Sequence, residues 1–294
     1  MKDWIRKLNS IQLKGEYSQS FQDGLIDYVF ENIGVTGALP FCVEFGFNSR
    51  SLTIGTGANV SKLILDHGWR SLLLDGGFEN HEINLFKHYL TTENICDIFE
   101  QYDVPLEPDY VSVDVDSTDL WLFDKLLSRY RARLFSVEYN SNFPLDRAIT
   151  ICNHPSKPWQ ADRAYGASLK ALNMVAQRHG YSLLWVVKYL DAFFIRNDLI
   201  DDGFSQLVFP FSNWRDMANC GCHRPVADLS RLSDLIDYEV YCSTEGDIEK
   251  SRLAADKVCR RVLLRNPVRT VSERIGNKAK KFMGFFNFPA ASNR

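Results

Sequence analysis

The chain has 294 residues, of which 45% are hydrophobic and 24% are charged, and its formal net charge is −3. This length allows one large domain or two modest ones, and the apolar fraction suits a packed globular core. The small net charge excludes a protein that binds polyanions along its whole length. An odd number of scattered cysteines, with no apolar run near the roughly 18 residues of a membrane span, predicts reduced thiols and a cytoplasmic location.

Charge is unevenly distributed along the chain. Residues 250–294 hold 12 Lys and Arg residues against two acidic residues, a local net charge of +10, so the remainder carries −13. A basic end on an acidic body predicts either a tail that contacts an anionic membrane surface or nucleic acid, or a solvated helical face. Cys220, Cys222 and His223 have the spacing of half a zinc site, but the second pair of ligands is missing, which argues against zinc.

Apolar periodicity predicts alternating helices and strands over the first 200 residues. In chain order we expect helix 19–33, strand 41–47, helix 60–67, strands 71–74 and 88–92, helix 93–101, strand 110–115, helix 120–127, strand 134–137, helix 167–179 and strands 181–188 and 192–196. Ser20 and Gly34 mark the two ends of the first helix. The last two strands are too close in sequence for a parallel crossover, so they form an antiparallel hairpin.

This alternation predicts the α/β fold class, with a mostly parallel, seven-stranded, Rossmann-like sheet that ends in an antiparallel hairpin. We expect this α/β domain to span residues 1–200. A C-terminal extension over 201–294 is predicted to be mainly helical and to be basic from residue 250 onward. Its expected helices lie at 229–238 and 247–264, followed by a last basic segment at 268–286.

Acidic residues follow two successive predicted strands, at the end of the sheet where open α/β folds bind their ligands. Asp114, Asp116 and Asp119 follow the first of these strands, and Glu138 follows the second. Asp114, Asp116 and Glu138 are the candidate catalytic residues, with Asp114 or Asp116 as a base toward a substrate hydroxyl. The same three carboxylates are the candidate ligands of a divalent metal such as Mg²⁺. In a structural alternative, Asp116 and Asp119 cap the next helix.

Two earlier strand ends offer candidate contacts for a nucleoside cofactor. Gly46 would let a ligand approach the backbone, and Glu44 would accept an ammonium group directly or through water. The alternative is a turn glycine beside a Glu that pairs with a nearby base. Asp75 closes the next strand, where an acid can accept both hydroxyls of a ribose. Asn59 is a candidate cofactor contact or, on local grounds, a helix N-cap.

Several sequence blocks follow one another in a specific order between Tyr17 and Leu199. They are YSQSFQDGLIDYVF at 17–30, FCVEFGF at 41–47, ANVSKLI at 58–64, GWRSLLLDG at 68–76, TTENI at 91–95, DYVSVDVDSTDLW at 109–121, VEYN at 137–140 and GASLKAL at 166–172. GYSLL and AFFIRNDL complete the series. Together they resemble the FkbM-like class I S-adenosylmethionine-dependent methyltransferases, and in particular a little-characterised branch of that family.

The resemblance implies an S-adenosylmethionine cofactor and transfer of its methyl group, usually to an oxygen. Carried over by position, the implied contacts run from the amino acid end of the cofactor through its ribose and adenine to the reacting methyl: Glu44 and Gly46, then Asp75, then Thr92 or Glu93, and last Asp114. The chain departs from the branch at Ser117-Thr118, where the branch has Gly-Asn, and at Asp191, where it has Asn.

The sequence therefore predicts an S-adenosylmethionine-dependent methyltransferase that methylates a hydroxyl of a glycan, a lipid-linked molecule or a small molecule. The alternative from another class is a non-catalytic module of the same fold, which acts through its basic C-terminal tail on an anionic membrane or nucleic acid. A third hypothesis is a metal-dependent transferase. We expect a cytoplasmic protein, with peripheral membrane contact as an option for the basic tail.

Overall fold

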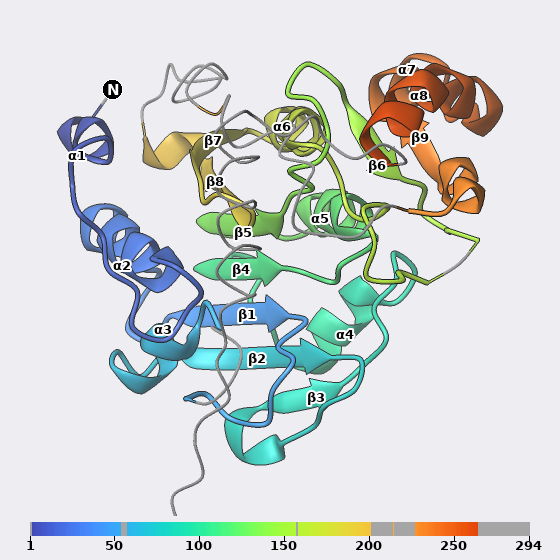
Figure 1. The fold of residues 1–294 in the computed structure, drawn as a ribbon. Coiled ribbons are helices and arrows are strands. Elements are labelled where there is room, and N and C mark those ends of the chain that lie inside the picture. Colours follow the sequence, from blue (N-terminus) through green and yellow to red (C-terminus); the bar gives the residue numbers. More distant parts are fainter. Residues whose placement is uncertain (1, 54–57, 157, 201–213, 215–226, 264–294) are drawn as a thin grey trace, which may run out of the picture.

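The computed structural model describes residues 2–53, 58–156, 158–200, 214 and 227–263 (Figure 1). Its centre is a seven-stranded sheet with the strand order β3-β2-β1-β4-β5-β8-β7. The strands are β1 (Phe41–Phe45), β2 (Arg70–Asp75), β3 (Leu85–Lys87), β4 (Tyr110–Val113), β5 (Leu134–Glu138), β7 (Tyr181–Val186) and β8 (Asp191–Arg196). Strands β1 to β5 pair in parallel, whereas β8 runs antiparallel to both β5 and β7. The predicted α/β fold class and its terminal hairpin are confirmed.

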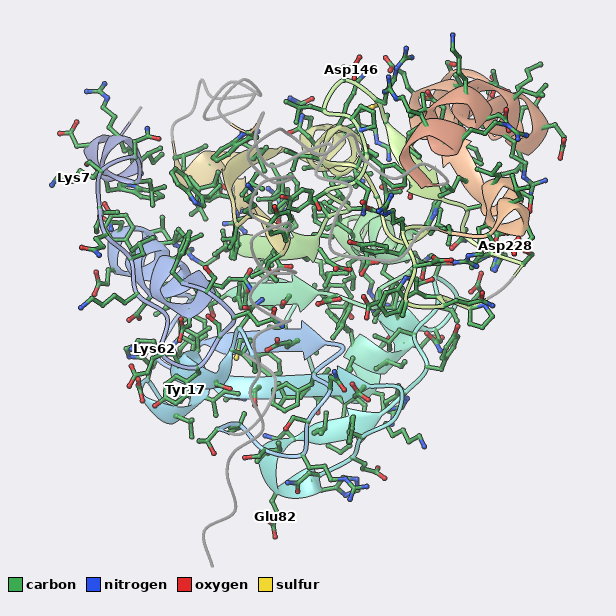
Figure 2. All side chains as sticks on the ribbon, in the orientation of Figure 1. Lys7, Tyr17, Lys62, Glu82, Asp146 and Asp228 are labelled. Atoms are coloured by element: carbon green, nitrogen blue, oxygen red, sulfur yellow. The ribbon has the colours of Figure 1, made fainter. Side chains whose placement is uncertain are left out.

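Helices cover both sides of this sheet. The described α-helices are α1 (Asp3–Lys7), α2 (Gln22–Ile33), α3 (Ser61–Leu65), α4 (Ile95–Gln101), α5 (Asp119–Leu127), α6 (Leu169–Arg178), α7 (Tyr238–Ser243) and α8 (Ile248–Leu263), of which α7 and α8 lie beside β9 of a second, smaller sheet. Figure 1 shows α2 and α3 on one side of the strands and α4, α5 and α6 on the other. Strands β1 and β5 are buried along their whole length, as expected for parallel strands with helices on both faces. Charged side chains such as Lys7, Glu82 and Asp146 project from the periphery (Figure 2).

The start of the first long helix differs from its prediction. Helix α2 begins at Gln22, and Ser20 lies in a left-handed conformation with φ of 60° instead of capping it. The carboxylate of Asp23 accepts the backbone N–H groups of Glu16 and Tyr17 at 2.8 and 2.7 Å. The polar segment before the helix is thus held by a side chain from inside the first helical turn, and Ser18 Oγ, in place of Ser20, accepts the backbone N–H of Asp23 at 2.8 Å.

Two further predictions need correction, and one sheet was not predicted. The third strand of the sheet is Leu85–Lys87 and not 88–92, which instead continues from this strand as a loop. A second sheet was not predicted: β6 (Ile149–Ile151) pairs antiparallel with β9 (Leu235–Asp237). The helix expected at 229–238 is instead a 3₁₀ helix, Leu229–Asp234, followed by β9. Short apolar runs of this kind do not distinguish strand from helix by periodicity alone.

The described part of the C-terminal extension packs on residues 143–168. Strand β9 completes the small sheet with β6, and helix α8, where a helix was predicted at 247–264, contacts β9. These elements share a small hydrophobic cluster of their own: Phe143, Ile149, Ile151, Ala164, Ala227, Leu235, Ala255 and Cys259. The domain boundary at residue 200 stays a prediction, but the two sides of it are joined by this sheet.

Some predictions fall on other parts of the chain. The Cys220–His223 motif, the segment 268–286 and most of the basic tail lie outside the described residues. Within the described ranges, no helix combines the length and the apolar character that crossing a membrane requires.

Candidate functional site

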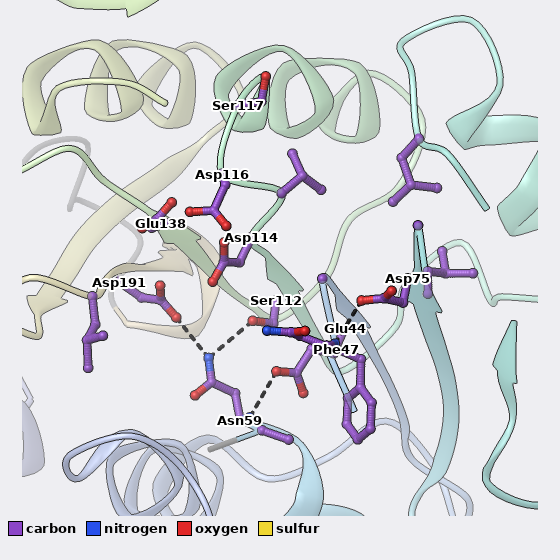
Figure 3. A pocket seen from close by; sticks show the side chains of 18 of the residues that line it. Glu44, Phe47, Asn59, Asp75, Ser112, Asp114, Asp116, Ser117, Glu138 and Asp191 are labelled. Carbon is purple, nitrogen blue, oxygen red and sulfur yellow. Dashed lines mark hydrogen bonds between the residues drawn. The ribbon is translucent and has the colours of Figure 1, made fainter. Parts of the chain in front are cut away.

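A cavity of about 680 Å³ lies beyond the carboxyl ends of β1, β2, β4 and β5 (Figure 3). Six carboxylate side chains line it: Glu44, Asp75, Asp114, Asp116, Glu138 and Asp191. The described residues that line it include no Lys or Arg. Such a lining favours cations, which stabilise the ionised form of the carboxyl groups, over phosphates, which these groups repel.

Three carboxylates come together at one wall of the cavity. Asp114, Asp116 and Glu138 each place a carboxylate oxygen within 4.8 Å of the others, and Figure 3 shows them pointing toward one another. The register of the sheet explains part of this arrangement, because Val113 at the end of β4 pairs with Val137 in β5. The predicted catalytic and metal-ligating residues therefore form one cluster, which we call the carboxylate triad.

Burial and mutual repulsion dominate the electrostatics of the triad. Burial, together with the charges of neighbouring carboxylates, raises the pKa of Asp114 and that of Glu138 well above their usual values. Glu138 is only 8% exposed, and its Oε2 atom has no hydrogen-bond partner among the described residues. A buried acceptor without a donor is unfavourable, so this oxygen marks a place where a ligand would gain binding energy.

The loop between β4 and α5 is held by a fourth acid. Asp119 accepts the backbone N–H of Val115 at 2.7 Å and that of Ser117 at 2.9 Å. Its burial raises its pKa to about 7, although these hydrogen bonds act in the opposite direction. Asp119 therefore stabilises the turn that presents Asp116, which has a left-handed φ of 55°. The N-cap position of this helix is Thr118 and its first residue is Asp119, so neither Asp116 nor Asp119 is the N-cap residue that the structural alternative expected.

Gly46 is required by the protein's own backbone. It has a φ of +64°, and a Cβ atom at this position would lie 2.0 Å from the carbonyl oxygen of Asp114. The end of β1 thus passes against the end of β4, and only glycine permits this contact. The close approach expected here is made by the backbone of Asp114, which keeps the triad next to β1.

Glu44 and Asn59 connect the first strand to α3. The carboxylate of Glu44 accepts the N–H groups of Asn59 and Val60 at 3.0 Å each, with one oxygen for each donor. Burial raises the pKa of Glu44 to about 7. A contact with an ammonium group stays a prediction, and it would use the lone pairs that remain on these oxygens.

Asn59 is not the N-cap that local sequence suggested, because the N-cap is Val60 and Glu44 binds the free N–H groups instead. Its side chain lies in the cavity, where Nδ2 donates to Asp191 at 2.8 Å and to Ser112 at 3.2 Å (Figure 3).

Asp75 lines the cavity at the end of β2, and most of its acceptor capacity is already used. Oδ1 accepts the N–H groups of Gly77 and Phe78 at 2.6 and 2.8 Å, and Oδ2 accepts that of Asn48 at 2.8 Å. A carboxylate accepts about four hydrogen bonds, which leaves room for about one more. Asp75 can therefore accept a hydrogen bond from one ribose hydroxyl, whereas the sequence predicted that it accepts both.

Thr92 and Glu93 are not brought to the cavity. Thr92 Oγ1 contacts Glu93 and Asn153 at the surface, at 3.1 and 3.4 Å. His88, Tyr89 and Leu90 line the cavity instead, a few residues earlier in the chain. That Thr92 or Glu93 lies near an adenine ring stays a prediction, although neither residue is among those that line the cavity.

Asp191 is the cavity residue that sequence reasoning missed as a site. It begins β8 directly opposite Glu138 in the antiparallel ladder, and burial raises its pKa to about 6. Hydrogen bonds from Asn59 and Ser136 oppose that rise. The signal was present in the sequence, because the predicted hairpin places the first residue of its second strand beside the end of β5.

No protein-family model matches the chain, and no curated protein matches it in sequence. The chemistry of the cavity therefore has to carry the functional argument, because a fold of this kind serves many functions.

Proposed function

We propose that this protein binds S-adenosylmethionine and transfers its methyl group to a hydroxyl of a glycan, a lipid-linked molecule or a small molecule. The observation that carries the proposal is the acidic lining of the cavity at the carboxyl end of a Rossmann-like sheet. S-adenosylmethionine is a nucleoside with a sulfonium and an ammonium group, so its net charge is positive. Dinucleotides and nucleoside phosphates bring negative charges to the same position of related sheets.

The topology supports this placement of the cofactor. The strand order runs from β1 toward β3 on one side and from β4 toward β5 on the other, so β1 and β4 flank the point where it reverses. Ligands of open α/β sheets bind in the crevice outside this point. Gly46 and Asp114 lie there, with Asp75 on one side and Glu138 on the other. In the proposal the nucleoside lies toward Asp75 and the acceptor toward Glu138.

Methyl transfer is an in-line displacement at the sulfonium carbon, so the protein mainly positions donor and acceptor. A base near the acceptor hydroxyl assists the reaction. Burial and neighbouring acids raise the pKa of Glu138, so its ionised form is a stronger base than an ordinary carboxylate. Within the proposal, Glu138 or Asp116 is the base, and Asp114 lies closest to the methyl group.

Isothermal titration calorimetry with S-adenosylmethionine tests the proposal. The wild-type protein should bind one equivalent, and Asp75→Asn should weaken binding because an amide is a poorer acceptor for a ribose hydroxyl. Asp146→Asn is the matched control, because this side chain is 81% exposed at the periphery and should leave binding unchanged (Figure 2). No heat at high micromolar cofactor, with protein that is folded by circular dichroism, would contradict the proposal.

A further inference from the structure

We propose that the carboxylate triad, Asp114, Asp116 and Glu138, binds a hard divalent cation such as Mg²⁺ or Mn²⁺. This inference concerns the same cavity as the proposed function but goes beyond it. The cation site would exist whether or not the protein binds S-adenosylmethionine.

The geometry of the triad is close to that of a cation site. Metal–oxygen distances are about 2.0–2.1 Å for Mg²⁺ and about 2.3–2.6 Å for Ca²⁺, so two oxygens bound to one ion lie at most about 4.2 Å apart for Mg²⁺ and about 5.2 Å apart for Ca²⁺. The three carboxylate oxygens of the triad lie within 4.8 Å of one another, so small side-chain rotations would bring them around one ion. They come from the end of β4, from the loop after it and from the end of β5, and the Asp119 hydrogen bonds hold that loop.

The unpaired oxygen of Glu138 is an independent observation that points to a ligand. Clusters of acids also occur where each carboxylate stabilises a turn, as Asp75 does with three backbone N–H groups. Glu138 differs, because it is more than nine-tenths buried, Oε2 has no donor among the described residues, and Figure 3 shows its carboxylate beside those of Asp114 and Asp116. The described residues therefore hold a buried acceptor in place without donating a hydrogen bond to it.

The described surroundings of Glu138 are acidic. The charged groups that most strongly raise the pKa of Glu138 are all acids: Asp114, Asp116, Asp119 and Asp191. No Lys or Arg side chain occurs among the described residues of the cavity lining. A cation would neutralise this repulsion, and carboxylate oxygens favour hard ions over the softer metals that bind Cys or His.

Three protein ligands leave coordination positions open. If the proposed function holds, an acceptor hydroxyl could occupy one of them, where the cation would favour its deprotonated form. This extension alone rests on the proposed function, and the binding experiment below does not depend on it.

The experiment measures Mn²⁺ binding to the full chain after EDTA treatment and dialysis, with electron paramagnetic resonance to detect free Mn²⁺ at pH 7.5. We expect one saturable site for which Mg²⁺ competes. Glu138→Gln and Asp116→Asn should each weaken binding at least about tenfold, which is the loss typical even of changes outside the first set of ligands. Asp75→Asn is the control in the same cavity and should bind Mn²⁺ as the wild type does.

Two results would overturn the inference: no saturable Mn²⁺ binding by folded wild-type protein, or unchanged affinity in both triad variants. Folding of each variant is checked by urea denaturation. The same samples titrated with S-adenosylmethionine in EDTA separate this inference from the proposed function. Loss of cofactor binding in Asp75→Asn with intact Mn²⁺ binding is the pattern expected if both hold.

Discussion

Two groups of acidic side chains in the described part of the molecule differ in the partners that they meet. In the C-terminal part, the fully buried Arg231 lies 3.5 Å from Asp162 and 3.4 Å from Asp234, and it donates to the carbonyl of Ala164 at 2.7 Å. In the cavity, six carboxylates meet no Lys or Arg among the described lining residues. Buried acids that are paired with arginine hold the small sheet in place. Buried acids without such a partner lower stability, and folds retain them where a ligand or a reaction uses them.

The largest loss of stability is expected on substitution of Arg231, the partner of the buried acids in the C-terminal part. Arg231→Met should lower the free energy of unfolding by about 3–5 kcal/mol, because it leaves Asp162 and Asp234 buried without their cation. Urea denaturation of the variant and the wild type measures the difference. A loss below about 1 kcal/mol would mean that these acids are not stabilised by the arginine, and the contrast between the two regions would fail.

A smaller loss of stability is expected on substitution of Gly46, where the end of β1 contacts the backbone of Asp114. Gly46→Ala should lower the free energy of unfolding by about 2–3 kcal/mol, since the new Cβ meets the carbonyl of Asp114 in addition to the strain of a positive φ. Gly68→Ala is the matched control, with a φ of +66° and no atom within 4 Å of the new Cβ. It isolates the backbone strain, for which we expect about 1 kcal/mol. Equal losses at both positions would contradict the close contact.

Two buried acids at and beside the cavity, Glu44 and Asp119, predict how the free energy of unfolding depends on pH. The pKa of Glu44 and that of Asp119 are raised to about 7 from values of 4.5 and 3.8, mainly by burial. The folded state therefore favours the protonated acids, and their stabilising contribution is complete below about pH 4 and is lost as the pH rises through 7. In EDTA, the free energy of unfolding should fall between pH 5 and pH 8, by on the order of 1–3 kcal/mol for each group.

An acid whose pKa is lowered affects the free energy of unfolding over a lower pH range. Burial favours a higher pKa for Asp23, but hydrogen bonds from Glu16, Tyr17 and Ser18 outweigh it, so the pKa is lowered. Its contribution is present at neutral pH and is lost only as the pH falls below about 4.

Urea denaturation between pH 5 and pH 8 measures the effect of the raised pKa values of Glu44 and Asp119. A free energy of unfolding that stays flat or rises over this range would contradict them.

The smallest effect is expected within the triad itself. In EDTA, Glu138→Gln should change the free energy of unfolding by less than about 1 kcal/mol, because burial and neighbouring acids already favour the uncharged form of Glu138, and no described residue donates a hydrogen bond to Oε2. Thermal and urea denaturation both measure this change. A loss as large as that of Arg231→Met would show that Glu138 stabilises the fold through a contact of its own.

Much of the fold followed from local patterns. Strand lengths and spacings predicted the parallel sheet and the hairpin, because so short a connection cannot form a crossover. The position of the acids at the strand ends could also be predicted, since parallel strands bring their carboxyl ends to one edge of the sheet. Asp75, Asp114 and Glu138 were placed correctly at the cavity for this reason.

The rest depends on contacts between distant segments. Asn59 has the local signature of an N-cap, but a carboxylate from β1 binds the N–H groups that it would have capped. The role of Gly46 depends on how closely β1 passes the backbone of Asp114, which no local pattern specifies. Strand β9 is too short to show a period of its own and becomes a strand by pairing with β6.

The central claim is that the cavity receives a positively charged nucleoside, and a paired titration tests it most directly. S-adenosylmethionine and ADP are titrated separately by calorimetry into the same wild-type protein, at equal concentrations in EDTA. Both carry adenosine, but one is cationic and the other brings phosphates into the acidic cavity. The account predicts saturable binding of S-adenosylmethionine and none of ADP. Binding of ADP without binding of S-adenosylmethionine would contradict it.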